Sequence, residues 1–124
     1  MDITPLVPKG RQLLTGYGGG GFRINNEFVG GSILLFAEGH HAWALTDAVQ
    51  LTAFSLQPVL EAAEPVELLL IGTGKSIAMI DSAIRPLFKS KGIALEVMDT
   101  GAACRTYNIL LAEERRVAAA LIAV

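Results

Sequence analysis

The sequence repeats one short pattern, Leu68-Leu69-Leu70-Ile71-Gly72-Thr73-Gly74 followed by Leu95-Glu96-Val97-Met98-Asp99-Thr100-Gly101. In each copy, an apolar run typical of a strand covered on both faces precedes Thr-Gly and then helix-forming residues. The copies lie 27 residues apart, a length that fits one strand–helix–strand crossover. Because such crossovers are right-handed, both Thr-Gly loops are predicted at the same carboxyl-terminal edge of neighbouring parallel strands, which ligands favour.

This edge is the candidate functional site. Its glycines allow a ligand to approach the backbone closely, and the Thr100 hydroxyl with the free N–H groups of a helix start can hold an anion or a carboxylate. Lys75 and Arg105 would add positive charge. An alternative stays open, in which Thr-Gly forms only a tight strand exit and a helix cap. The candidate ligand or partner cleft comprises Gly72, Thr73, Gly74, Lys75, Asp99, Thr100, Gly101, Cys104, Arg105 and Tyr107.

The second half of the chain alternates helical and buried-strand patterns. Helices are predicted over residues 56–63, 81–91 and 100–114, with Thr46, Ser55 and Thr100 as caps, and strands over 66–71, 93–98 and 116–122. Proline is costly inside a helix, so the second helix either begins near Ala83, with Pro86 in its first turn, or is kinked. The run 116–122 either extends the third helix to about 25 residues or forms a strand, and we favour the strand because that helix is long for a small domain.

The first half is rich in glycine and in short β-prone runs, at residues 12–17, 22–25, 28–36 and 42–45. These runs predict an antiparallel meander, with a tight hairpin at Asn25-Asn26 and a turn or bulge at the glycines 18–21. The expected fold is therefore α/β with an α+β tendency. A single domain over residues 1–124 is expected, with the meander followed by a βαβαβ half.

Composition excludes several functional classes. The net charge is -2 and no basic stripe is present, so nucleic acid is not an expected partner. A single cysteine excludes an intramolecular disulfide and a cysteine-rich zinc site. The longest apolar run, residues 117–124, is far shorter than a membrane-spanning helix requires. Asp2 stands where a secretory signal has basic residues, so a soluble, cytoplasmic protein is expected.

Cys104 is the one candidate nucleophile. A position early in a helix, beside Arg105, would lower the pKa of its thiol, whereas free cysteines are more commonly buried as small apolar residues. The adjacent His40 and His41 lie in a turn-like stretch and lack a third ligand at metal spacing, so a solvated loop is favoured and no metal site or cofactor is predicted.

Taken in order, six segments resemble the small Mth-type domain family, whose eukaryotic relatives include the mitochondrial respiratory complex I assembly factor 3. They are Ile3-Thr4-Pro5, Gly16-Tyr17-Gly18, Gly20-Gly21-Phe22-Arg23-Ile24, Gly31-Ser32-Ile33-Leu34, Leu70-Ile71-Gly72-Thr73-Gly74 and Met98-Asp99-Thr100-Gly101-Ala102-Ala103-Cys104-Arg105-Thr106-Tyr107-Asn108. The resemblance implies a three-layer α/β fold with a mixed sheet and no established enzymatic activity or cofactor. Many members have glycine where this chain has Glu114, so the helix exit is expected to differ here.

Two classes of function follow. The resemblance implies a non-catalytic interaction protein that contacts a protein partner during assembly of a respiratory or other membrane complex, so an enzyme is the less favoured interpretation. The alternative is a small-ligand-binding protein or a thiol-dependent enzyme, with Cys104 as thiolate and Arg105, Lys75 or Tyr107 positioning an anionic group. A homo-oligomer formed through the region 22–36 is a third hypothesis.

Overall fold

The central sheet is built from strands whose residues are apolar at consecutive positions. In the computed structural model, which describes residues 10–124, β6 (Leu68–Gly72) and β8 (Val117–Leu121) lie at its centre and are buried on both faces. β6 pairs in parallel with β8 and with β7 (Ala94–Met98). β4 (Ile33–Phe36) pairs antiparallel with β8 and with β5 (Gly39–Ala42), so that the strand order is β5-β4-β8-β6-β7. The sheet is therefore mixed.

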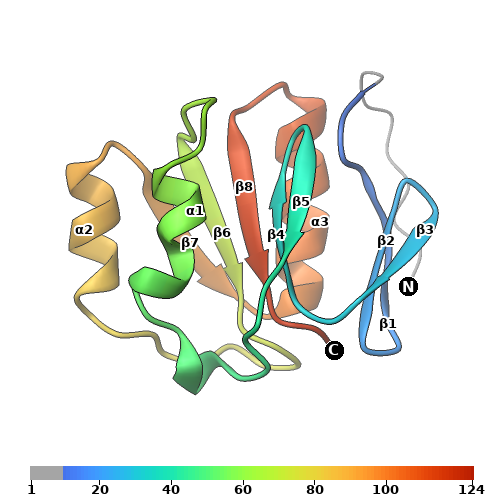
Figure 1. Cartoon of the computed structure of the whole chain (residues 1–124), viewed down its shortest axis with the longest axis horizontal. Helices are drawn as coiled ribbons and strands as arrows, with labels where there is room; N and C mark the ends of the chain where they lie inside the picture. The colour runs from blue at the N-terminus through green and yellow to red at the C-terminus, as the bar shows by residue number, and fades with distance from the viewer. Residues whose placement is uncertain (1–9) are drawn as a thin grey trace.

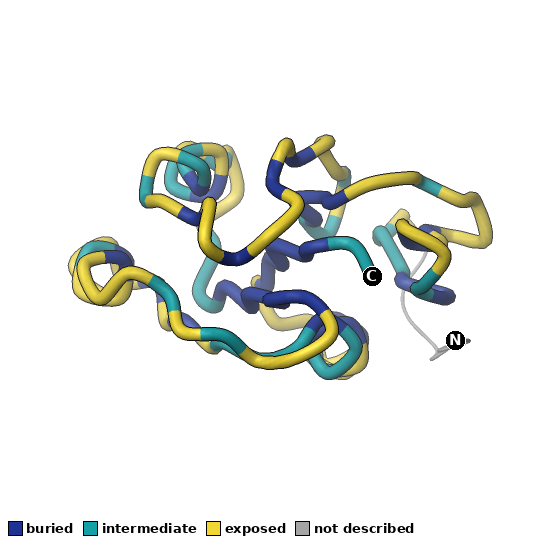
Figure 2. The backbone as a smooth tube through the Cα atoms, turned by 90° about the horizontal axis from the view of Figure 1, so that it is seen from below, coloured by how far each residue is buried: buried dark blue, intermediate teal, exposed yellow. Residues whose placement is uncertain are grey.

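Helices and a second sheet cover the two faces of this sheet, forming three layers (Figures 1 and 2). One face packs against α1 (Gln57–Leu60), α2 (Ile84–Ser90) and two 3-10 turns, η1 (Ala48–Gln50) and η2 (Phe54–Leu56). The other face packs against α3 (Thr100–Ala112) and a three-stranded antiparallel sheet, β1 (Leu14–Gly18), β2 (Gly21–Ile24) and β3 (Glu27–Gly30). Alternate residues of β6 serve the two cores, Leu69 and Ile71 on one side and Leu70 on the other.

The predicted βαβαβ half is confirmed as β6-α2-β7-α3-β8. α2 begins at Ile84, which places Pro86 in its first turn, where the missing N–H removes no helical hydrogen bond. The last apolar run forms strand β8 rather than a continuation of α3. Because β7 lies on one side of β6 and β8 on the other, the two crossover helices cover opposite faces of the sheet.

The predicted meander is divided between two sheets. Residues 28–36 do not form one strand, because Gly30 ends β3 and Gly31, at φ +83°, turns the chain into β4. The prediction of a strand at residues 42–45 is wrong. The strand is β5 instead, and it places His40 and His41 opposite Leu35 and Leu34 of β4 rather than in a turn.

The turns form where they were predicted, whereas the helix caps differ from the predicted residues. The Asn25-Asn26 hairpin is confirmed, with φ of +50° and +69°, and the glycines at 18–20 form the predicted turn. Asp99 rather than Thr100 caps α3, and Asp47 rather than Thr46 caps η1. Ser55 lies within η2, and the predicted helix over 56–63 shortens to α1, since acidic Glu61 and Glu64 are unfavourable at a helix carboxyl end.

α3 ends in a Schellman motif that has glutamate where glycine is usual. The Arg115 N–H donates to the Leu110 carbonyl at 3.0 Å and the Glu114 N–H donates to the Leu111 carbonyl at 3.0 Å, with Glu114 at φ +60°. The helix exit thus keeps the left-handed geometry that glycine favours. Glu114 must bear the steric cost of that geometry.

Glu114→Gly is expected to raise the free energy of unfolding by about 1 kcal/mol, because glycine relieves the strain of a positive φ. Urea denaturation measures the change. Glu113→Gly is the matched control, since Glu113 at φ -84° bears no such strain and should lose stability through added freedom of the unfolded chain. Equal effects of the two substitutions would contradict the strain argument.

Candidate functional site

The two Thr-Gly loops meet at one edge of the sheet, as predicted, and they bind each other directly. The Thr100 N–H donates to the Gly74 carbonyl at 2.8 Å, and the Gly74 N–H donates to the Thr100 Oγ1 at 2.9 Å. The same hydroxyl donates to the Ile122 carbonyl at 2.7 Å. Thr100 is fully buried, and its hydroxyl is already engaged by the Gly74 N–H and the Ile122 carbonyl.

The close approach of α3 explains one glycine of the pattern. A Cβ atom on Gly72 would lie 2.9 Å from the Thr100 Cα and 3.1 Å from a Leu121 methyl carbon, so a larger residue would push the helix away from the sheet. Thr73 shapes the loop that follows. Its hydroxyl donates to the Ser76 carbonyl at 2.8 Å and accepts the Ala78 N–H at 3.0 Å.

Other predicted site residues lie at the start of α3. The Asp99 carboxylate accepts the Ala102 N–H at 2.8 Å and caps the helix. Arg105 is exposed and donates to the Tyr17 hydroxyl at 2.8 Å, while a Cβ on Gly101 would lie 2.8 Å from that hydroxyl. Lys75 is exposed on the loop after β6. Arg105, Gly101 and Tyr17 are thus brought together.

Tyr107 lies away from this edge, inside the core between α3 and the three-stranded sheet. It is fully buried and its hydroxyl donates to the Gln12 carbonyl at 3.1 Å. Burial raises the pKa of the Tyr107 phenol, so the group stays protonated at neutral pH. The residue is placed to hold the chain before β1 rather than to meet a ligand.

Asn108, a residue that our sequence reasoning did not single out, also joins these layers. Its side-chain oxygen accepts the Leu14 N–H at 3.1 Å, and its side-chain nitrogen donates to the Leu14 carbonyl at 2.6 Å. Both residues are buried, so the amide satisfies main-chain groups that water does not reach. The signal that could have identified Asn108 is its position: it is a polar residue next to Tyr107, on the apolar face of a predicted helix.

Cys104 is buried among the apolar residues that α3 presents to the sheet. Burial raises the pKa of its thiol to about 12, and the nearby Arg105 guanidinium offsets only part of this effect. The shift is opposite in direction to the one that a thiolate nucleophile needs, and the burial of Cys104 agrees with the packing interpretation. Within residues 10–124, no three histidine, cysteine or acidic side chains gather as a metal site would require.

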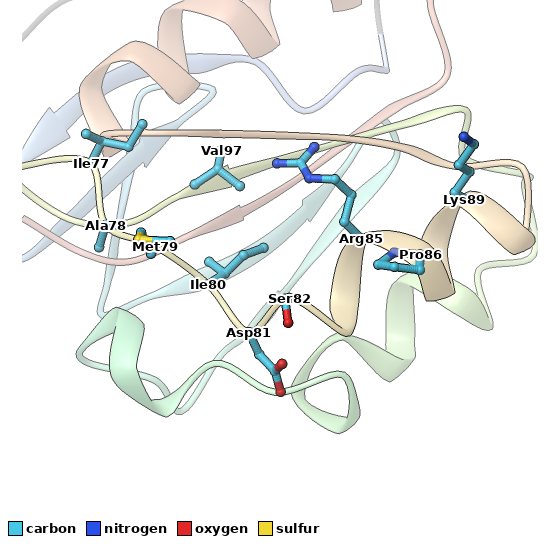
Figure 3. Close-up of a pocket in the computed structure, with 10 residues that line it drawn as sticks. All are labelled: Ile77, Ala78, Met79, Ile80, Asp81, Ser82, Arg85, Pro86, Lys89 and Val97. Carbon is cyan, nitrogen blue, oxygen red and sulfur yellow. The ribbon is translucent and has the colours of Figure 1, made fainter.

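A groove beside the edge strand β7 was missed by our sequence reasoning. Its volume is about 820 Å³, and its walls are the loop from Ile77 to Ser82 and the α2 face carrying Arg85 and Lys89, with Val97 between them (Figure 3). Met79 is 95% exposed and Ile77 66%. A signal was present, because the apolar residues at 77–80 belong to no predicted strand or helix. Ala78 and Ile80 pack partly against the core, whereas Ile77 and Met79 are exposed.

Residues 14–122 match the family described as a protein of unknown function (DUF498/DUF598). The chain belongs to this family. The solved structures similar to it include an outer membrane protein from Bartonella henselae (41% identity, TM-score 0.85, 96% of this chain and 99% of that one). Another is a Bordetella pertussis protein described as an Mth938-like domain (30% identity, TM-score 0.80, 98% and 91%).

Two curated relatives are similar over most of this chain. NADH dehydrogenase [ubiquinone] 1 alpha subcomplex assembly factor 3 of Xenopus tropicalis is 34% identical over 86% of this chain, and its human counterpart is 35% identical over 86%. The chain spans 58% of the length of each of these relatives. The resemblance inferred from sequence is confirmed, although Ile3-Thr4-Pro5 lies outside the described residues. None of the helices in the described part of the chain is long and apolar enough to cross a bilayer.

Asn108→Leu is expected to lower the free energy of unfolding by about 2–4 kcal/mol, because it leaves the buried Leu14 N–H and carbonyl without partners. Urea denaturation provides the measurement. Ile109→Ala, on the exposed side of the same helix, is the control and should change stability by less than about 0.5 kcal/mol. Similar losses in the two variants would contradict a stabilising role for the Asn108 amide.

The Cys104 thiol is expected to resist iodoacetamide at pH 8 in the folded protein and to react once urea unfolds the chain. With its pKa raised to about 12, the thiolate fraction at this pH is on the order of a thousandfold below that of an unfolded cysteine. Mass spectrometry follows the labelling. The double variant Cys104→Ala/Arg105→Cys is the control, since residue 105 is exposed and should be labelled without urea; rapid labelling of native Cys104 would restore the thiol hypothesis.

Proposed function

We propose that this chain is a protein-interaction module that assists assembly of a respiratory membrane complex and binds a protein partner without catalysing a reaction. The observation that carries the proposal is the similarity to relatives named as complex I assembly factor 3, which extends over 86% of this chain. The burial of Cys104 weakens the thiol-enzyme alternative, because its pKa moves away from the range of a nucleophile.

We propose the carboxyl-terminal edge of β6, β7 and β8 as the contact surface, at the lower side of Figure 1. It includes the exposed parts of the two Thr-Gly loops, with Lys75 and Arg105, and the neighbouring apolar side chains of Ile77 and Met79. Apolar side chains exposed in one loop are costly unless a partner covers them. The predicted homo-oligomer stays a prediction, and light scattering on the purified chain would test it.

Met79→Asp is expected to reduce capture of respiratory-complex subunits severalfold, because it places a charge in the proposed apolar contact. The tagged chain is expressed at native level, cross-linked in cells and captured for mass spectrometry. Ile109→Asp is the matched control, with an apolar side chain 59% exposed on α3, outside the proposed surface. A wild-type capture without respiratory-complex subunits would overturn the proposed role, and equal loss in both variants would overturn the proposed surface.

A further inference from the structure

The edge strand β7 presents main-chain groups to the side away from β6. The Ala94 N–H donates to the Glu67 carbonyl at 2.9 Å and the Met98 carbonyl accepts the Thr73 N–H at 2.9 Å, so these two residues direct their main-chain groups toward β6. Because this direction alternates along a strand, Leu95 and Val97 direct theirs outward. Among residues 10–124, only the Leu95 carbonyl has a partner on this open side, the Arg85 guanidinium.

Two hollows lie along this open edge, and together they form the groove considered below. The hollow at Val97, of about 820 Å³, adjoins a second of about 390 Å³ lined by Gly92, Ile93, Ala94 and Leu95, and both include Arg85 and Lys89. The two hollows thus extend from the start of β7 to its next-to-last residue. Figure 3 shows Arg85 reaching from α2 toward Val97, opposite the apolar loop.

The charges along the groove favour one kind of occupant. Arg85 and Lys89 are exposed, one turn apart on α2, and Asp81 is the only acidic residue lining either hollow in the described chain. The ion pairs found in residues 10–124, Arg11–Glu38 and Arg115–Glu67, leave both of these basic groups without a carboxylate. An acidic side chain of a partner would complement them.

We propose that β7 binds an extended segment of a partner protein as an additional strand of the sheet, with alternate side chains that are apolar or acidic directed into the groove. Main-chain hydrogen bonds to the Leu95 N–H and to the N–H and carbonyl of Val97 would hold the segment, because the Leu95 carbonyl is already used by Arg85. The loop at 77–80 would contact its apolar side chains, and Lys89 would pair with its carboxylate. A segment of about five residues, roughly 17 Å, matches the length of β7.

A second copy of this chain fits the groove less well. Pairing of β7 with the β7 of another copy would bring two sets of Arg85 and Lys89 to one interface, where like charges repel. This site rests on the proposed interaction function only in that the partner is a protein. Its test therefore uses purified protein and defined peptides.

In the test, the full chain is used as bait to select heptapeptides from a random displayed library. A selected peptide is then synthesised and its affinity for the chain is measured. We expect the selected peptides to carry apolar and acidic residues at alternate positions. Lys89→Glu should weaken their binding at least tenfold, whereas Lys91→Glu, which removes an exposed lysine of the same region outside the groove, should leave it unchanged. Selection of no such peptides, or an equal loss of peptide affinity in both variants, would overturn the proposal.

Two further readouts address strand addition itself. Hydrogen exchange of the complex should show new protection of the Leu95 and Val97 amides. Two peptides, one N-methylated at its odd backbone positions and the other at its even positions, should differ. Only the peptide whose methyl groups replace the N–H groups that face β7 should lose binding. Protection confined to other elements, or a free chain that is already a dimer with both amides protected, would overturn the proposal. Peptide binding at β7 without respiratory subunits in the cellular capture would leave the edge site standing and reject the respiratory role.

Discussion

The hydroxyl of Thr100 holds three parts of the molecule in one place. It accepts a hydrogen bond from the loop after β6 and donates one to the carbonyl that follows β8, while its own residue begins the helix after β7. Because Thr100 is fully buried, none of these groups has water as an alternative partner. The position of α3 across the sheet depends on this arrangement, and the three-stranded sheet depends on α3.

Much of the fold could be predicted because its strands and helices carry clear periodic patterns. The alternation that identifies a strand, however, fixes which side chains share a face and does not say which sheet the strand joins. The division of the meander at Gly31 was therefore not predictable from the pattern. The same limit applies to β5, whose short Gly39–Ala42 segment has no apolar alternation and is recognised only through its pairing with β4.

The candidate site was only partly predictable, for a different reason. The repeated Thr-Gly pattern correctly predicted that both loops share an edge, yet it is compatible with an open cleft and with a closed contact, and only the distances between the loops distinguish these. The groove beside β7 was harder to foresee, because it is formed by a loop without periodicity and by the outward side of a strand. Its basic residues, Arg85 and Lys89, are ordinary surface residues in the sequence of α2.

Several polar residues of the segment 98–108, one of those that carry the family resemblance, are used inside this molecule. Asp99, Thr100, Tyr107 and Asn108 cap, clamp and connect elements, and their polar atoms are engaged by the chain itself. The surfaces left for a partner are formed largely by residues outside that stretch. In this chain the segment 98–108 therefore contributes mainly to the scaffold, and the surface proposed for a partner lies largely in neighbouring loops and edges.

The pairing of Asn108 with Leu14 also bears on how the chain folds. These residues are separated by 94 positions, so the first three strands cannot reach their final packing until α3 has formed. Contacts of such long range require closure of a large loop and slow the folding of a domain. During synthesis, the segment from β1 to β3 leaves the ribosome well before its helix does, and its apolar side chains are without their final cover for that interval.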